Sequence, residues 1–188
     1  MANRIVSLDD LDILFADFIQ DQLELNNDQV LISYQQRGQK FPQIDKDTVF
    51  VKVFQEQDER LIYKQRKRSY DKETERVISS QTAMRTLLLQ VVFYGCNSDI
   101  LATTLNERFY FDSAKQFLYK NNLALIPDLT DFQDKTYEKI NGQWWERSDL
   151  KLRFYNSITV DEKTSTIEKI DVKYNFDGIK IIHDKEEK

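Results

Sequence analysis

The chain of 188 residues has little cysteine, histidine, glycine or proline. Its one cysteine, Cys96, cannot form a disulfide within the chain, which favours assembly inside a cell. We expect Cys96 to be a small buried apolar residue at a strand end, because no histidine lies near it in sequence. The single histidine, His183, lies in a charged C-terminal segment, so the usual general base and most transition-metal sites are missing. The scarcity of glycine and proline argues against linkers and low-complexity segments.

Long apolar runs and glycine-rich phosphate-binding loops are also missing. No segment approaches the roughly 18 apolar residues of a membrane span, and the N-terminus lacks the apolar core of a signal peptide. We therefore expect no membrane association. The absence of a Gly-x-Gly-x-x-Gly or Gly-x4-Gly-Lys pattern argues against nucleotide binding by such a loop, and no cofactor is predicted.

Charge and length set further bounds. The formal net charge is -5, which disfavours a dedicated nucleic-acid-binding domain. Hydrophobic residues make up 40% and charged residues 31%, so the core is adequate but thin. We expect a single domain over residues 1–175, with a charged arm at about 61–76 and a partly disordered C-terminal tail at 176–188.

The hydrophobic pattern predicts an α+β fold, with helices packed on one face of a mostly antiparallel sheet. The first helix should run from Leu8 to Gln22, after a capping box formed by Ser7 and Asp10. The macrodipole explains Asp9, Asp10 and Asp12 as helix-stabilising acids. Further elements expected in chain order are strands at Val30–Tyr34, at Thr48–Phe54 and from Leu61, a central strand covered by helices within Arg76–Tyr94, one or two helices between Ile100 and Leu118, and a strand at Leu123–Ile126.

The C-terminal part shows a strand pattern of period two. Leu150, Leu152 and Phe154 fall on one side of a strand. A second strand is expected at 166–174, and the polar stretch Asp161–Ser165 between them predicts a turn, so the pair is predicted to form a closing hairpin. Residues 35–42 and 127–141 are predicted to be loops, the latter with at most one helical turn.

A basic cluster precedes an acidic one between residues 64 and 75. Such a charged segment cannot form a core and must project as a loop or a long hairpin arm. Three readings stay open for it: contact with a subunit, a solvated loop, and contact with DNA, since Tyr63 and Tyr70 flank the basic residues. The basic residues are Lys64, Arg66, Lys67 and Arg68.

Two adjacent tryptophans open the strand that contains Leu150. Adjacent strand positions point to opposite faces, so one of Trp144 and Trp145 should be buried and the other should lie on the opposite face. The second could anchor a protein interface or belong to a small second core. The candidate subunit or ring–ring interface residues are therefore Lys64, Arg66, Lys67, Arg68, Tyr70, Trp144, Trp145 and Arg147.

Three aspartates recur at every third position, at Asp128, Asp131 and Asp134. Hard cations prefer such oxygen ligands, but acids in a polar loop are more often solvated, and no metal site is predicted. No catalytic residue is predicted either. A metal-dependent hydrolase that uses these aspartates is the remote alternative.

Taken as a set, the segments resemble the phage neck terminator family, whose fold is related to that of tail terminators. The resemblance covers most of the chain, from Leu8 to about Tyr174. It includes the glycine and proline segment Tyr34–Pro42 and a strand like Val49–Phe54. The most telling part is Trp145–Tyr155, which resembles the family's Trp-Glu-x-Arg pattern before an alternating strand. The other matching segments are Arg85–Gly95, Asp99–Phe117 and Ile167–Val172.

The resemblance implies a structural virion protein in the neck, assembled in the host cytoplasm. It implies a ring of about six copies at the head-proximal end of the tail tube, which ends tube polymerisation and joins the tail to the head. Its expected partners are further copies of itself, the tail-tube protein, a head-side connector or stopper and, where there is one, the tail sheath. DNA would pass through the lumen without specific binding. The main alternative is another head-to-tail adaptor or a tail-tube subunit.

Overall fold

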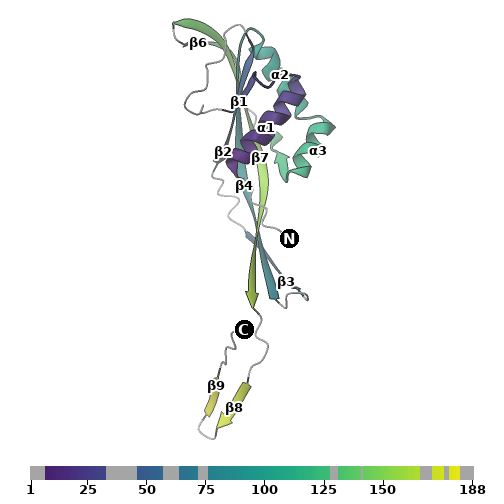
Figure 1. Cartoon of the computed structure of the whole chain (residues 1–188), viewed down its shortest axis with the longest axis vertical. Coiled ribbons are helices and arrows are strands. Elements are labelled where there is room, and N and C mark those ends of the chain that lie inside the picture. The colour runs from purple at the N-terminus through teal and green to yellow at the C-terminus, as the bar shows by residue number, and fades with distance from the viewer. Residues whose placement is uncertain are drawn as a thin grey trace.

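The computed structural model describes residues 7–32, 46–56, 64–71, 76–127, 131–140, 142–165, 171–175 and 178–182, with the backbone only at 131–134, 163–165, 171–175 and 178–182. Figure 1 shows the helices and strands. The helices are α1 (Leu8–Leu23), α2 (Ser98–Arg108) and α3 (Asp112–Lys120). The strands are β1 (Val30–Ile32), β2 (Thr48–Glu56), β3 (Lys64–Asp71), β4 (Arg76–Tyr94), β5 (Leu123–Leu125), β6 (Asp131–Ile140), β7 (Gln143–Ser165), β8 (Asp171–Asn175) and β9 (Gly178–Ile182).

Seven strands form one mixed, mostly antiparallel sheet in the order β1-β2-β4-β7-β5, with β3 added to β4 and β6 added to β7. The long strands β4 and β7 pair from Arg76 opposite Ser165 to Tyr94 opposite Arg147. On the other side of β4, β2 pairs with one half of the strand and β3 with the other half. The β1–β2 pair is parallel. The predicted α+β fold class is confirmed.

The three helices lie together on one face of this sheet, beside one half of the long strands (Figure 1). α1 begins at the predicted capping box, where Ser7 Oγ accepts a hydrogen bond from the Asp10 N–H at 3.1 Å. Helical spacing directs the apolar side chains of α1 into the core, where Phe15 packs against Phe154 of β7 with ring centroids 5.1 Å apart. Each such buried aromatic side chain stabilises the fold by about 2 to 3 kcal/mol. We call this half of the molecule, with the helices, the body.

β4 is central in the sheet, as predicted, but the helices cover only one of its faces. Leu87, Leu89 and Phe93 are fully buried beneath the helices. Leu88 and Val92, which alternate with them, point to the opposite face and stay partly exposed. The strand is therefore central and covered by helices, but on one face only, and its apolar residues on the other face stay partly exposed.

The prediction of a loop over 127–141 is wrong, because Asp131–Ile140 forms β6. β6 pairs with β7 in antiparallel register, with a bulge between Gln133 and Thr136. Its residues lack an apolar alternation, but the ladder to β7 satisfies their backbone groups whatever the side chains are.

The predicted closing hairpin is wrong as well. β7 continues as a strand through Asp161–Ser165, the expected turn, and pairs there with β4. β8 instead pairs with β9 in a separate two-stranded sheet. β9 falls within the segment 176–188. The predicted loop at 35–42, the strand start at 61–63 and His183 lie outside the described residues.

Two residues have environments other than those predicted. Asp12 does more than complement the macrodipole: its carboxylate is buried and accepts a hydrogen bond of 2.7 Å from the Val53 N–H of β2. It also pairs with Lys52. Cys96 is exposed rather than buried, in the turn between β4 and α2.

Candidate functional site

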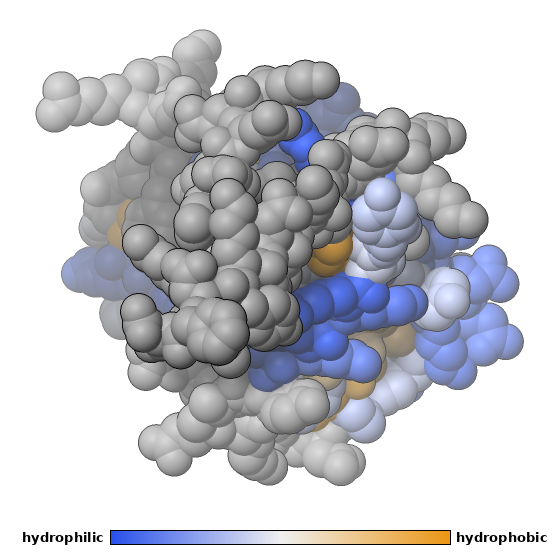
Figure 2. Space-filling model, turned by 90° about the horizontal axis from the view of Figure 1, so that it is seen from below, coloured by the Kyte–Doolittle hydropathy of each residue, from blue (hydrophilic) through white to orange (hydrophobic). Residues whose placement is uncertain are grey.

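β3, the first half of β4 and the second half of β7 extend past the helices as a three-stranded sheet (Figure 1). We call residues 64–71, 76–85 and 157–165 the arm. None of the arm's described side chains is buried. Figure 2, a view along the long axis, shows mainly hydrophilic side chains with small hydrophobic patches among the described residues. The arm therefore has no hydrophobic core of its own.

The strand geometry of β3 divides the predicted basic cluster between two faces. Lys64, Arg66 and Arg68 lie on one face together with Tyr70, and Lys67 lies on the other. Arg66 Nε donates a hydrogen bond to Gln81 of β4 at 3.3 Å, while the tip of the row carries the exposed ring of Tyr70. The cluster is thus a basic row along one edge of the arm.

Buried polar contacts join the arm to the body. Asn156 of β7 is buried and accepts a 2.8 Å hydrogen bond from Arg85 Nε of β4. Its own amide donates to the Asn122 carbonyl at 3.1 Å, and the Ser157 N–H donates to the same carbonyl. These contacts fix both long strands where they leave the body.

The other predicted interface residues lie at the opposite end of β7. Trp145 is buried, with 8% of its surface exposed, on the sheet face that the helices leave open. Its ring meets Tyr94 edge-on at 5.9 Å. Arg147 lies over the same Tyr94 ring, and two carboxylates hold its guanidinium. We call Tyr94, Glu138, Trp145, Arg147 and Asp149 the Trp145 cluster.

Charge pairing is tight in the Trp145 cluster. Arg147 binds Asp149 through two hydrogen bonds, of 2.7 and 2.8 Å, and Glu138 through a third of 2.8 Å. The Tyr94 hydroxyl also donates to Glu138, at 2.8 Å. The bond to Asp149 raises the pKa of Arg147, and the bond from Arg147 lowers the pKa of Glu138. Burial, followed by the bond to Glu138, raises the pKa of Tyr94 to about 12.

Trp144 points away from the Trp145 cluster and is 66% exposed. Lys139 of β6 lies over its ring, with Nζ 5.9 Å from the ring centroid. One tryptophan is therefore buried and its neighbour exposed, as the alternation predicts. The buried one belongs to a small second cluster outside the main core.

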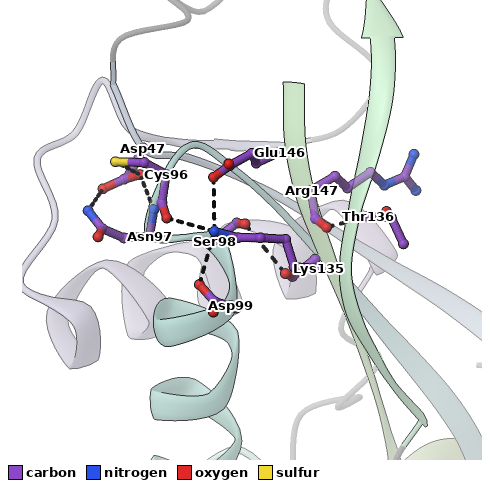
Figure 3. Close-up of polar contacts among 10 residues, drawn as sticks. Asp47, Cys96, Asn97, Ser98, Asp99, Lys135, Thr136, Glu146 and Arg147 are labelled. Carbon is purple, nitrogen blue, oxygen red and sulfur yellow. Dashed lines mark hydrogen bonds and ion pairs between the residues drawn. The ribbon is translucent and has the colours of Figure 1, made fainter. Parts of the chain in front are cut away.

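Lys135 ties this end of the sheet to α2 (Figure 3). Its ammonium donates to Glu146 of β7 at 2.9 Å and to the Cys96 carbonyl at 3.0 Å, and pairs with Asp99 in the first turn of α2. The hydrogen bond to Glu146 raises the pKa of Lys135. On the far side of the turn, Asp47 accepts hydrogen bonds from the backbone and side chain of Asn97.

The predicted interface residues thus form two groups, one on the arm and one at the other end of β7. The fourteen or so residues of β7 between Arg147 and Asp161 span about 46 Å. The structure adds Tyr94, Lys135 and Glu138 to the second group. Sequence reasoning missed Lys135 and Glu138 because it assigned their segment to a loop; the β-prone Thr136, Tyr137 and Ile140 were the available signal.

Neither a metal centre nor a membrane helix is found in the described part of the chain. There, no three histidine, cysteine or carboxylate side chains gather to hold a metal ion. The side chains of Asp128, Asp131 and Asp134 lie outside the described residues, so the hydrolase alternative stays a prediction. None of the described helices combines the length and the apolar character needed to span a membrane.

The chain matches the model of a known protein family. No curated protein sequence matches the chain. The model of the family described as phage neck terminator protein matches residues 9–180, which take in both long strands, all three helices and the arm. That family comprises structural components of the phage neck and is not a known enzyme family. The chain therefore belongs to the phage neck terminator family, and is a structural protein of the bacteriophage virion.

Proposed function

We propose that the chain closes into a ring of about six copies at the head-proximal end of the tail tube. There the ring ends tube polymerisation and joins the tail to the head connector. The observation that carries the proposal is the arm, a three-stranded sheet that leaves the body without a covering layer.

A sheet without a packed face is marginally stable by itself. Met84 and Val160 of the arm are 45% and 40% exposed, as the arm's own strands do not cover them. Contact with a neighbouring copy would remove this apolar surface from water, and each such side chain would contribute on the order of 1 kcal/mol. The arm therefore supports a subunit that completes its fold in an assembly.

Ring closure needs two different surfaces on each subunit, because a heterologous interface repeats by rotation. The arm and the end of β7 that carries the exposed Trp144 supply separate surfaces for neighbours and adjoining rings. We propose that these surfaces contact further copies, the tail-tube protein, the head-side connector or stopper and, in tails that have one, the sheath. Residues 1–175 would form the single domain of the subunit, assembled in the host cytoplasm.

DNA passes through such a ring without being bound by it. The net charge of -5 supports this role, because carboxylates that line a lumen repel phosphates. The basic row of β3 would be occupied by protein contacts instead.

Native mass and negative-stain microscopy of the purified chain test the proposal. We expect discrete rings, whereas long filaments would identify a tail-tube subunit instead. Because some rings could close only on their partner, the same measurement is repeated with the tail-tube protein added. A chain that stays monomeric with and without the tube protein would contradict the proposal.

Deletion of residues 63–74, which removes β3, tests the role of this strand of the arm. We expect the shortened chain to keep the fold of the body but to lose ring formation and head-to-tail joining. Removal of residues 184–188 is the matched control and should leave both intact. Unchanged rings after this deletion would show that β3 has no part in closure.

A further inference from the structure

The arm has two open edges, one along β3 and one along the last part of β7. Within the described residues β3 pairs with β4 alone, and β7 has no strand partner on its other edge beyond Ser157, whose N–H donates to the Asn122 carbonyl. Unpaired strand edges present N–H and C=O groups that can template pairing with another chain. An arm with an open edge on each side can therefore join to other arms in series.

The two edges carry opposite charges. β3 has the four basic residues of the cluster against one carboxylate, Asp71. The open part of β7, residues 158–165, contains two carboxylates, Asp161 and Glu162, both at least partly exposed, against one lysine, Lys163. Like edges would therefore repel each other, whereas unlike edges attract.

The charged residues of the two edges also lie at the same height along the arm. Ser80 of β4 is opposite Lys67 on one side and Asp161 on the other. Ser79 is likewise flanked by Arg68 and Glu162. Within one chain these charges are two strand spacings apart, about 9.6 Å. A copy placed beside the arm at the same height would bring Lys67 next to Asp161 and Arg68 next to Glu162.

On this basis we infer that the β3 edge of one subunit adds to the β7 edge of the next, in parallel, and that the arms so form a continuous sheet around the ring. The inference rests on the proposed ring. β3 and β7 both run opposite to β4, hence in the same direction. Rotation about an axis along the strands preserves that direction and the height, so the new ladder is parallel and Lys67 meets Asp161.

Alternation places the two charge pairs on opposite faces of the joined sheet. Lys67 and Asp161 lie on the face that continues the open side of the body, and Arg68 and Glu162 lie on the helix side. In a closed ring each arm then has its β3 edge paired with one neighbour and its β7 edge paired with the other. No strand edge stays free, which removes the aggregation hazard of the single arm.

A cysteine pair tests the contact. The variant Lys67→Cys with Asp161→Cys is made in a Cys96→Ser background, because Cys96 is exposed. Disulfides need Cα atoms about 4.4 to 6.8 Å apart, so the two positions can bond between neighbouring chains but not within one. Mild oxidation of the purified chain, and of virions assembled from it, should give a ladder of covalent oligomers that a reductant abolishes.

The matched control is Lys67→Cys with Ser157→Cys, which lie about 13 Å apart in height. It should yield roughly tenfold less of the cross-linked product. Intact rings without covalent oligomers would overturn the edge pairing and leave the proposed ring standing. If the chain were monomeric both as the purified protein and in virions, the edge pairing and the proposed ring would both be overturned. A covalent adduct to a different virion protein instead of oligomers would also overturn the pairing.

Charge reversal gives a test that does not depend on disulfide geometry. Lys67→Asp or Asp161→Lys alone should raise the concentration needed for half-maximal assembly at low salt by roughly threefold or more, and the double reversal should restore it. The thermal transition of each dissociated variant shows whether the subunit still folds. A double variant as weak as the singles would contradict the inference.

Discussion

Arg147 is held by carboxylates of its own subunit, although its sequence context suggested an interface. Its guanidinium faces Asp149 through two donors and Glu138 through a third. Such bidentate pairs fix geometry as well as charge. Arg147 therefore stabilises the fold at the end of β7, in addition to any contact that it makes with a partner.

The Arg147→Ala variant is expected to lower the free energy of unfolding by about 2 to 3 kcal/mol, because it leaves the buried Asp149 carboxylate without its ion pair. Urea denaturation of the dissociated subunit measures this loss. Lys151→Ala, on the same face of β7, is the control and should cost no more than about 0.5 kcal/mol. Equal losses in the two variants would contradict the structural role of Arg147.

Tyr94 predicts a loss of stability at alkaline pH. Its pKa is raised from 10.0 to about 12 in the folded chain. A raised pKa means that the unfolded chain releases the proton first, so the stabilisation is complete below pH 10 and falls as the pH rises to about 12. Thermal unfolding should therefore show a steeper decline over this window for the natural chain than for Tyr94→Phe. Parallel declines would contradict the assignment.

At the level of elements, Asp12 of α1 protects the edge of β2. β1 pairs with β2 at Val49–Val51, and just beyond this the buried Asp12 carboxylate accepts the Val53 N–H. A helix side chain thus takes the place of a neighbouring strand, which closes the edge to other chains.

Asp12→Ala should destabilise the subunit by about 2 kcal/mol, since a hydrogen bond to a charged group is lost in a buried place. Equilibrium denaturation measures this change. Asp9→Ala, exposed in the first turn of the same helix, loses only a macrodipole interaction and should cost less than about 1 kcal/mol. A cost for Asp12→Ala no larger than that of Asp9→Ala would argue against the edge contact.

The turn from β4 to α2 depends on Gly95. Its φ is +122°, and a Cβ there would lie 2.9 Å from the Asp47 Cα. Gly142, with φ +83° and open space around it, offers a matched control. Gly95→Ala should cost about 3 kcal/mol or more and Gly142→Ala about 1 kcal/mol, measured by thermal and urea denaturation. Similar costs would mean that backbone strain alone, and not the contact with Asp47, sets the requirement.

At the scale of the whole molecule, β4 and β7 connect two regions of different local stability. In the body they lie under three helices, and in the arm they have no covering layer. Few buried contacts mean that a region opens easily. Assembly would then be expected to order the arm more than the body.

Hydrogen exchange along β4 measures this difference within one strand. In the dissociated subunit, amides of residues 77–84 should be protected roughly 100-fold less than those of residues 87–93. In assembled rings the two protection levels should approach each other. Equal protection in the dissociated subunit would show that the arm is stable without neighbours, and would remove the main support for the proposed ring.

Local patterns predicted the elements whose side chains face the core. The capping box and helical spacing of α1 and the alternation of Leu150, Leu152 and Phe154 were enough, because burial imposes a period on the residues that experience it. The same reasoning placed one tryptophan of the pair inside and the other outside. It also led to the family, through the order of these segments.

The polar strands form because of strand pairing, not because one of their faces is buried. None of the described side chains of β6, β3 and the last part of β7 is buried, and each of these segments forms a strand because β4 or β7 offers it a backbone ladder. Tertiary structure determines which strand pairs with which, because the backbone hydrogen bonds of the ladder do not depend on the side chains. The sequence by itself therefore determines the core, whereas the arm and its two charged edges are decided only by the pairing of the long strands β4 and β7.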